Sequence, residues 1–171
     1  WQFHRLRRGG FITQGSHPVG WCPGCGNPVG QHDTKGDVEP EIAEVTLLKF
    51  RLNNGIVVPV ATYRPETIFG VTNIWINPDI DYRVVDIDGE KWLASKECFE
   101  KLKYQSKKVD DSKERTIRGN TLIGEAALNP ETGEKCLVLP ASFVDPKTGT
   151  GVVMSVPGHA PYDYLALRDL K

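Results

Sequence analysis

The sequence is short of the features that define several large classes of protein. Its 171 residues include a single methionine, and the formal net charge is only -1. No run approaches the roughly eighteen apolar residues of a membrane-spanning helix, and no signal peptide opens the chain. A charge so near neutrality disfavours a protein held on DNA mainly by counterion release, but it allows a small contact with an RNA end. We therefore expect a cytoplasmic protein with neither DNA nor a membrane as its partner.

Cysteine is also scarce. Of the four cysteines, only Cys22 and Cys25 are close in sequence, so a disulfide framework is disfavoured. Their Cys-x-x-Cys spacing is half of a zinc knuckle, because two thiolates so placed can bind one metal ion. The remaining candidate ligands are His17, His32, Cys98 and Cys136. None repeats the knuckle spacing, so zinc at Cys22 and Cys25 stays open beside an incomplete half-site or plain reduced thiols.

The two ends of the chain lack ordinary start and stop signals. The sequence begins at Trp1 without an initiator methionine, and it finishes at Lys171 within a helical pattern. We expect a piece of a larger protein. A loop rich in Gly, Asp and Lys over residues 31–39 predicts a connecting segment over 1–40, which contains the Cys-x-x-Cys turn, and one domain over 41–171.

Short apolar stretches of strand length dominate that domain. Asn-Gly at 54–55 and Asp-Gly at 88–89 are typical of tight hairpin turns. Strands are expected over residues 11–13, 44–52, 56–61, 71–76, 82–87, 91–94, 119–128, 135–140 and 152–156. Residues 71–76 alternate apolar and polar, which is typical of a strand, and the turn residues Asn-Pro-Asp at 77–79 end it.

Helices are fewer. Residues 1–8 resemble the end of a helix closed by Gly9, residues 96–104 present Cys98, Phe99 and Leu102 as one inner stripe, and a last helix begins near Asp163. The charged run 107–118 is expected to face solvent. Many short strands with few helices predict an α+β fold, a small β-barrel-like mixed fold with a few peripheral helices.

One candidate site is the polar stretch TYRPETIFG over residues 62–70, which separates two apolar strands. Thr62 and Thr67 flank Arg64, and Pro65 restricts the backbone of Arg64. This pattern indicates a pocket wall lined by small hydroxyl groups rather than a core segment.

Another candidate site spans residues 148–163, with the sequence TGTGVVMSVPGHAPYD. Its Gly-Thr-Gly precedes a strand, whereas a phosphate-binding loop precedes a helix, so we reject a nucleotide loop. Asp163 stands near the start of the last helix. It is either a first-turn carboxylate favoured by the helix dipole or an anionic anchor for an ammonium group.

These motifs together resemble the inserted editing domain, connective peptide 1, of class I leucyl-tRNA synthetases. The resemblance covers nearly the whole chain, and the motifs stand in the family's order. The opening Trp-Cys-Pro-x-Cys-Gly is similar to the segment by which such an insert leaves the synthetic core. The segments that are similar to the archaeal and eukaryotic branch are Asn73-x-Trp75-x-x-Pro78 and Ala166-Leu167-Arg168-Asp169-Leu170-Lys171. The synthetase's own ATP-binding signatures are absent, so ATP would serve only the full-length enzyme. The valyl and isoleucyl relatives share much of the pattern.

The resemblance implies hydrolysis of the ester that joins a non-cognate amino acid to the 3′ end of tRNA(Leu), without a cofactor. The implied partners are that tRNA end and the synthetase body. Asp163 would hold the substrate α-ammonium, Thr62 and Arg64 would serve the adenosine end and the hydrolytic water, and these three are the expected catalytic residues. Thr67 would exclude cognate leucine by shape. The expected substrate-binding residues are Tyr63, Thr67, Met154, Val156, His159 and Asp163.

Two alternatives stay open at this point. His159 is either a general base or a solvent-facing turn residue. The chain is either a hydrolase or a binding module that captures the tRNA end without cleaving it. The sequence departs from the bacterial pattern at Tyr63, where a second threonine would stand, and at Ala160 and Pro161, where polar residues would follow the histidine.

Overall fold

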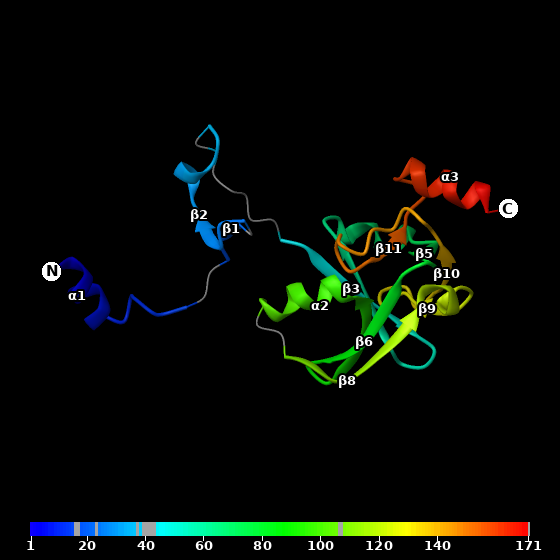
Figure 1. Ribbon diagram of the computed structural model, residues 1–171, viewed down its shortest axis with the longest axis horizontal. Helices are drawn as coiled ribbons and strands as arrows, with labels where there is room; N and C mark the ends of the chain where they lie inside the picture. The colour runs from blue at the N-terminus through cyan, green and yellow to red at the C-terminus, as the bar shows by residue number, and fades with distance from the viewer. Residues whose placement is uncertain (16–17, 23, 37, 39–43, 106–107, 171) are drawn as a thin grey trace. The chain divides into compact units, whose positions relative to one another are not determined.

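The structure is a computed structural model that describes residues 1–15, 18–22, 24–36, 38, 44–105 and 108–170 of the chain. These residues form two compact units, Trp1–Glu44 and Val45–Lys171 (Figure 1). The boundary expected between residues 40 and 41 lies outside the described residues. No helix in the described ranges is long and apolar enough to cross a membrane.

The first unit begins with α1 (Gln2–Arg8), which ends at Gly9 as the sequence predicts. The strand predicted over residues 11–13 is wrong. The Phe11 N–H donates to the Leu6 carbonyl at 3.0 Å, so this segment closes the helix and pairs with no described strand. The other elements of the unit are β1 (Gly20–Cys22), β2 (Asn27–Val29) and the 3-10 helix η1 (Gln31–Asp33).

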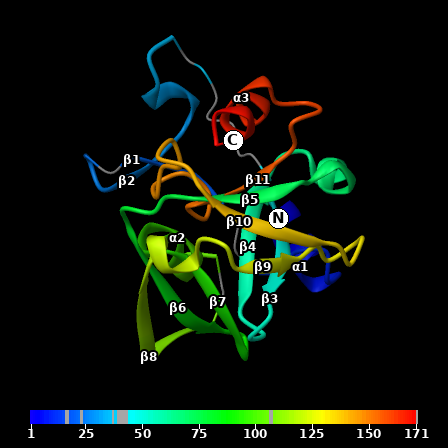
Figure 2. The same ribbon diagram turned by 90° about the vertical axis from the view of Figure 1, so that its right-hand side faces the viewer.

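The second unit is built on one mixed sheet of nine strands (Figure 2). The strands are β3 (Thr46–Leu52), β4 (Val57–Thr62), β5 (Asn73–Ile76), β6 (Asp81–Ile87), β7 (Glu90–Ser95), β8 (Val109–Arg118), β9 (Ala126–Leu128), β10 (Lys135–Pro140) and β11 (Val152–Ser155). The helices are η2 (Pro65–Gly70), α2 (Lys96–Lys103), η3 (Gly119–Leu122) and α3 (Pro161–Asp169).

The strand order is β11-β5-β10-β9-β3-β4-β7-β6-β8. The pairs β5–β10 and β4–β7 are parallel, and the other pairs are antiparallel. The predicted α+β class is confirmed. The term β-barrel-like is too loose, because β11 and β8 end the sheet and do not pair with each other in the described part of the chain.

The predicted hairpin turns are confirmed. Asp88 and Gly89 both have positive φ, 53° and 88°, as a two-residue turn between twisted strands requires. Gly55, with φ of 84°, lies in the connection between β3 and β4. Local turn chemistry therefore fixes the register of both hairpins.

Helix α2 packs as its pattern predicts. Cys98, Phe99 and Leu102 are buried against apolar side chains of the neighbouring strands. The Ser95 hydroxyl caps the helix by accepting from the Cys98 N–H at 3.2 Å. The helix thus covers one part of the sheet, while a larger apolar cluster that includes Phe50, Ile74 and Met154 fills another.

Two segments differ from the prediction. Residues 119–128 form η3 and only a three-residue strand, because Gly119 is pressed against the Asn77 carbonyl: an added Cβ would lie 2.1 Å from that oxygen. The charged run from 108 to 118 is largely exposed as predicted, but it forms β8, an edge strand paired with β6. Charged side chains on an exposed edge protect it from pairing with other chains.

Strand β5 forms within the predicted range 71–76 and is buried along its whole length. All four of its residues are buried. The strand lies between β10 and β11 (Figure 2). Ile74 and Ile76 enter the large apolar cluster, whereas Trp75 packs with α3 residues on the opposite face. Strand β5 is therefore buried on both of its faces.

Replacing Tyr82 with Phe tests the hydrogen bonds that join β6 to the residue just before β11. The buried Tyr82 hydroxyl accepts from the Asn77 N–H at 3.0 Å and donates to the Gly151 carbonyl at 2.8 Å. Its loss leaves two backbone groups unsatisfied, so Tyr82→Phe should lower the free energy of unfolding in urea by about 1–3 kcal/mol. The matched control is Tyr104→Phe, because Tyr104 is 90% exposed; it should change stability by less than about 0.5 kcal/mol. Equal stability of the two variants would contradict this account.

Candidate functional site

Two segments that are distant in sequence meet at the edge of the sheet. We call residues 62–70 the hinge and residues 155–163 the turn. The Thr72 N–H, just after the hinge, donates to the Ser155 carbonyl at 3.0 Å. A Cβ built on Gly70 would lie 3.3 Å from a methyl carbon of Val156. The structure therefore brings together the two segments that the sequence singles out.

The backbone of Arg64 organises the hinge. The Thr62 hydroxyl accepts from the Arg64 N–H at 3.0 Å, and the Thr67 hydroxyl donates to the Arg64 carbonyl at 2.8 Å. Pro65 begins η2 at its first position, where a missing N–H costs nothing. Both threonines are half-buried, and the hydroxyl of each is bonded to the backbone of Arg64, so the pocket wall stays a prediction.

The charged side chains of the hinge face solvent. Arg64 Nε and Glu66 Oε1 are 2.9 Å apart, and both side chains are more than half exposed. The pKa of Glu66 is lowered mainly by this hydrogen bond. Smaller contributions to the lowered pKa come from a backbone N–H and from the charges of Arg64 and His159. Tyr63 is 73% exposed. The effect of His159 on Glu66 also places the exposed histidine near the hinge.

The turn is tight, and its histidine points outward. The backbone N–H groups of His159 and Ala160 both donate to the Val156 carbonyl at 2.9 Å. His159 is exposed, as the solvent-facing alternative expects. Met154 and Val156 are buried in the large apolar cluster, at 9% and 7% exposure.

Asp163 lies in the first turn of α3 and is nearly enclosed, with 8% of its surface exposed. Its Oδ1 accepts from the indole N–H of Trp75 at 2.9 Å, and its Oδ2 accepts from the Val156 N–H at 2.8 Å. A carboxylate has about four acceptor positions, so these bonds leave part of its capacity unused. The side chain is thus an oriented group beside the turn rather than a free surface anchor.

Sequence reasoning missed Trp75 as part of this site. The sequence predicts the strand that contains Trp75, but its hydrogen-bond partner Asp163 lies 88 residues later in the chain. The available signal was the residue type, because a buried tryptophan usually finds an acceptor for its indole N–H. Asn73 on the same strand is also buried, and its Nδ2 is the buried side-chain nitrogen without a partner among the described residues.

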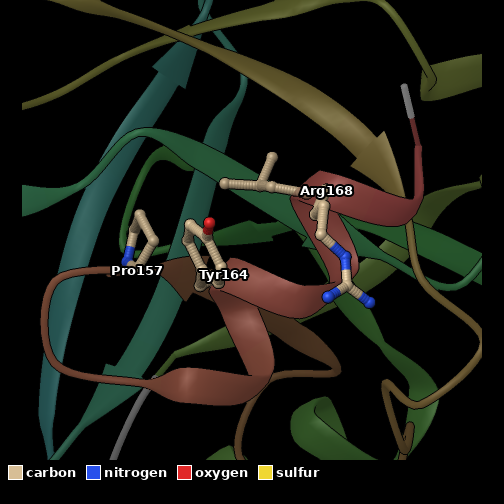
Figure 3. Close-up of a pocket in the computed structure, with 4 residues that line it drawn as sticks. Pro157, Tyr164 and Arg168 are labelled. Atoms are coloured by element: carbon tan, nitrogen blue, oxygen red, sulfur yellow. The ribbon is translucent and has the colours of Figure 1, made fainter.

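A hollow in the described part of the chain lies next to the turn. It has a volume of about 330 Å³ and is lined by Pro157, Tyr164, Leu167 and Arg168 (Figure 3). These residues lie along α3 and at the start of the turn, and none belongs to the predicted site residues. The hollow therefore adjoins the turn without being the predicted pocket.

The Cys-x-x-Cys turn brings two thiols close together. The Cys22 and Cys25 sulfur atoms are 3.2 Å apart, and the Cys25 N–H donates to Cys22 Sγ at 3.4 Å. The described residues contain no group of three or more potential ligands, and His17 lies outside them. Two thiols are half of a structural zinc site, so zinc at this turn stays a prediction.

Comparison with known proteins identifies relatives over most of the chain. Residues 44–168 match the family described as "Leucyl-tRNA synthetase, editing domain". A leucine–tRNA ligase of Pyrobaculum aerophilum is 55% identical over 170 residues, and one of Methanopyrus kandleri is 51% identical over 172. These alignments cover 99% and 100% of this chain but only 18% of each relative. The chain thus spans about a fifth of the length of these relatives.

Solved structures give the same result for the fold. The crystal structure of GlLeuRS-CP1 aligns with a TM-score of 0.69 and 26% identity, covering 74% of this chain and 60% of that one. The editing domain of the P. knowlesi cytosolic leucyl-tRNA synthetase aligns with a TM-score of 0.64 and 20% identity, covering 75% and 61%. The second unit therefore has the fold of these domains.

Alkylation by iodoacetamide near neutral pH should distinguish the four cysteines. Hydrogen bonds from the Cys25 thiol and backbone lower the pKa of Cys22, and the same contact raises the pKa of Cys25. Burial raises the pKa of Cys98 to about 11 and also raises that of Cys136. Because the thiolate is the reactive form, Cys22 should be modified first, Cys25 next, and the buried pair only in urea. Peptide mass spectrometry over time measures this order; early modification of Cys98 in the folded chain would contradict it.

Proposed function

Because the chain belongs to the leucyl-tRNA synthetase editing-domain family, we propose that its hinge and turn form the site that hydrolyses mischarged aminoacyl-tRNA. The observation that carries the proposal is the contact between these segments, with the oriented carboxylate of Asp163 at the end of the turn. Asp163 binds the α-ammonium of the substrate through a charge-assisted hydrogen bond. The site thereby recognises an aminoacyl ester.

The proposed reaction is the hydrolysis of an activated ester. A water oxygen bonds to the acyl carbon, the ester C–O bond breaks, and the adenosine hydroxyl leaves with a proton; the amino acid is released as a carboxylate, with a proton passing to solvent. Positioning the water and stabilising charge suffice for such a leaving group, so we assign no nucleophilic triad and no cofactor. Thr62 and Arg64 serve the adenosine end and the water. Arg64 uses its Nε on Glu66, and its two terminal nitrogens make no hydrogen bond with described residues.

The proposed specificity depends on shape. The site of a synthetase that attaches amino acids to tRNA discriminates poorly between side chains that differ by one methylene. A second site that hydrolyses the mischarged products is therefore needed. Thr67 is half-buried and held by its bond to Arg64, so its methyl group has a fixed direction. We assign it the exclusion of leucine, and we assign Tyr63, Met154, Val156 and His159 to the surroundings of the substrate. Met154 and Val156 would reach the substrate only after local rearrangement of the buried turn.

The identity of the tRNA and the cellular compartment are also proposals. An editing domain of a tRNA synthetase implies tRNA and the body of that enzyme. We propose that the tRNA is tRNA(Leu) carrying a non-cognate amino acid, and that the domain works in the cytoplasm. The relatives are leucine–tRNA ligases, which favours this tRNA over those of valine or isoleucine.

A second candidate is a module that binds the tRNA end without cleaving it. The local bonds of the Thr62 and Thr67 hydroxyls favour it, because both groups are already engaged by the Arg64 backbone. Thr62 and Thr67 would then form part of a binding surface and would not activate a water molecule for hydrolysis. Activity measurements separate the two candidates.

Incubation of the chain with mischarged tRNA(Leu) tests hydrolysis directly. Samples charged with isoleucine, valine or methionine should release free amino acid faster than in buffer, and EDTA should not slow the release. Acid-precipitable radiolabel measures the remaining ester. Tight binding without release would support the module and contradict the hydrolase.

Replacing Thr67 with Ala tests specificity. Removing the methyl and hydroxyl should open space for leucine, so Thr67→Ala should raise hydrolysis of leucyl-tRNA(Leu) at least roughly tenfold. Thr121→Ala is the matched control, because the Thr121 hydroxyl donates to the Arg118 carbonyl at 2.7 Å in η3, with the same spacing as Thr67 and Arg64. The control should still spare the leucyl ester. A Thr67→Ala variant that also spares it would contradict the assignment.

A further inference from the structure

The contact between Trp75 and Asp163 joins strand β5, next to the edge of the sheet, to the start of α3. The indole Nε1 and Asp163 Oδ1 are 2.9 Å apart, and Trp75 is fully buried. An internal hydrogen bond of this kind, between a neutral donor and a carboxylate, is stronger than one between two neutral groups. The bond therefore constrains the direction of the Asp163 side chain.

Trp75 is held firmly by its surroundings. Its backbone lies between Leu139 of β10 and Val153 of β11 in the sheet register. The ring of Phe143 meets the indole edge to face, with centroids 5.7 Å apart. Ala166 and Leu167 of α3 pack against the same cluster. A donor fixed on all sides can orient a carboxylate without losing further side-chain entropy.

The negative charge of Asp163 has no partner of opposite sign within the described chain. Its two hydrogen-bond donors among the described residues, the Trp75 indole and the Val156 N–H, are both neutral, and none of the ion pairs between described residues includes it. A nearly buried carboxylate without a cation is costly to maintain unless a cationic ligand completes the site. The remaining acceptor positions of Asp163 are therefore suited to an ammonium group.

We propose that Trp75 is a positioning residue for ammonium recognition, and this proposal rests on the function proposed above. Its indole N–H holds Oδ1, the Val156 N–H holds Oδ2, and the carboxylate is thereby fixed with its unused acceptor positions toward the α-ammonium of the substrate. Trp75 itself does not touch the substrate. The competing explanation is that the bond only ties α3 to the sheet.

The test compares two stable analogues that differ in one charge. Each is an aminoacyl-adenosine with an amide in place of the ester; one has a free α-ammonium, and the other is N-acetylated. Calorimetry on the chain should give a preference for the free ammonium of roughly 10- to 100-fold. Trp75→Phe keeps an aromatic ring and removes the N–H, so this preference should fall roughly fivefold or more. Asp163→Asn should abolish it.

A matched control exists in the same chain. Trp92 is also a buried tryptophan whose indole donates to a carboxylate, that of Glu90, at 3.4 Å, but it packs in the cluster that includes α2. Trp92→Phe should leave the preference within about twofold of the original, since the Trp92 indole bonds Glu90 and not Asp163. A purely structural role of Trp75 would lower the affinity for both analogues equally and would overturn the proposal.

A second measurement does not depend on the stability of the variant. In nitrogen-15 spectra of the unsubstituted chain, the indole N–H resonance of Trp75 should move on binding the free-ammonium analogue and stay unmoved with the acetylated one. A resonance indifferent to both would overturn the proposal. If the unsubstituted chain shows no preference for ammonium, the role of Asp163 fails as well; if the preference exists and survives in Trp75→Phe, the inference about Trp75 alone fails.

Discussion

The buried carboxylate of Asp163 is the group on which the arrangement of the site depends. Trp75 on β5, the strand next to the edge strand β11, and the backbone of Val156 both donate to it, so one side chain ties together the sheet, the turn and the first turn of α3. Loss of one partner of such a group costs more than an average hydrogen bond, because the charge stays buried. Strand burial, helix placement and turn geometry are therefore coupled at this point.

The rest of the unit supports this contact. Strand β5 is buried on both faces, with Trp75 toward α3 and Ile74 toward the large apolar cluster. The hinge reaches the same place through its contact with Val156. Its two threonines are organised by local bonds to Arg64, so the hinge adds two oriented small side chains to the segment that contacts the turn. The combination suits recognition of a small cationic group whose neighbour is selected by shape.

Local signals in the sequence predict much of the fold. The Asp88-Gly89 turn, the inner stripe of α2 and most of the strands follow from turn chemistry and periodicity, which act over a few residues. The failures have non-local causes. The strand predicted from residue 119 breaks where Gly119 meets the Asn77 carbonyl, and no periodicity reports that approach. The hinge and the turn were identified as sites from their motifs, but the Trp75 partner of Asp163 follows from topology alone, since 88 residues separate the two.

A structure of the chain with the free-ammonium, amide-linked aminoacyl-adenosine tests the central claim most directly. The account predicts the ammonium nitrogen within about 2.7–2.9 Å of an Asp163 oxygen, with the Trp75 indole still bonded to that carboxylate and Thr67 beside the amino-acid side chain. An ammonium bound away from Asp163, or an adenosine analogue seated against a surface that excludes both hinge and turn, would contradict it.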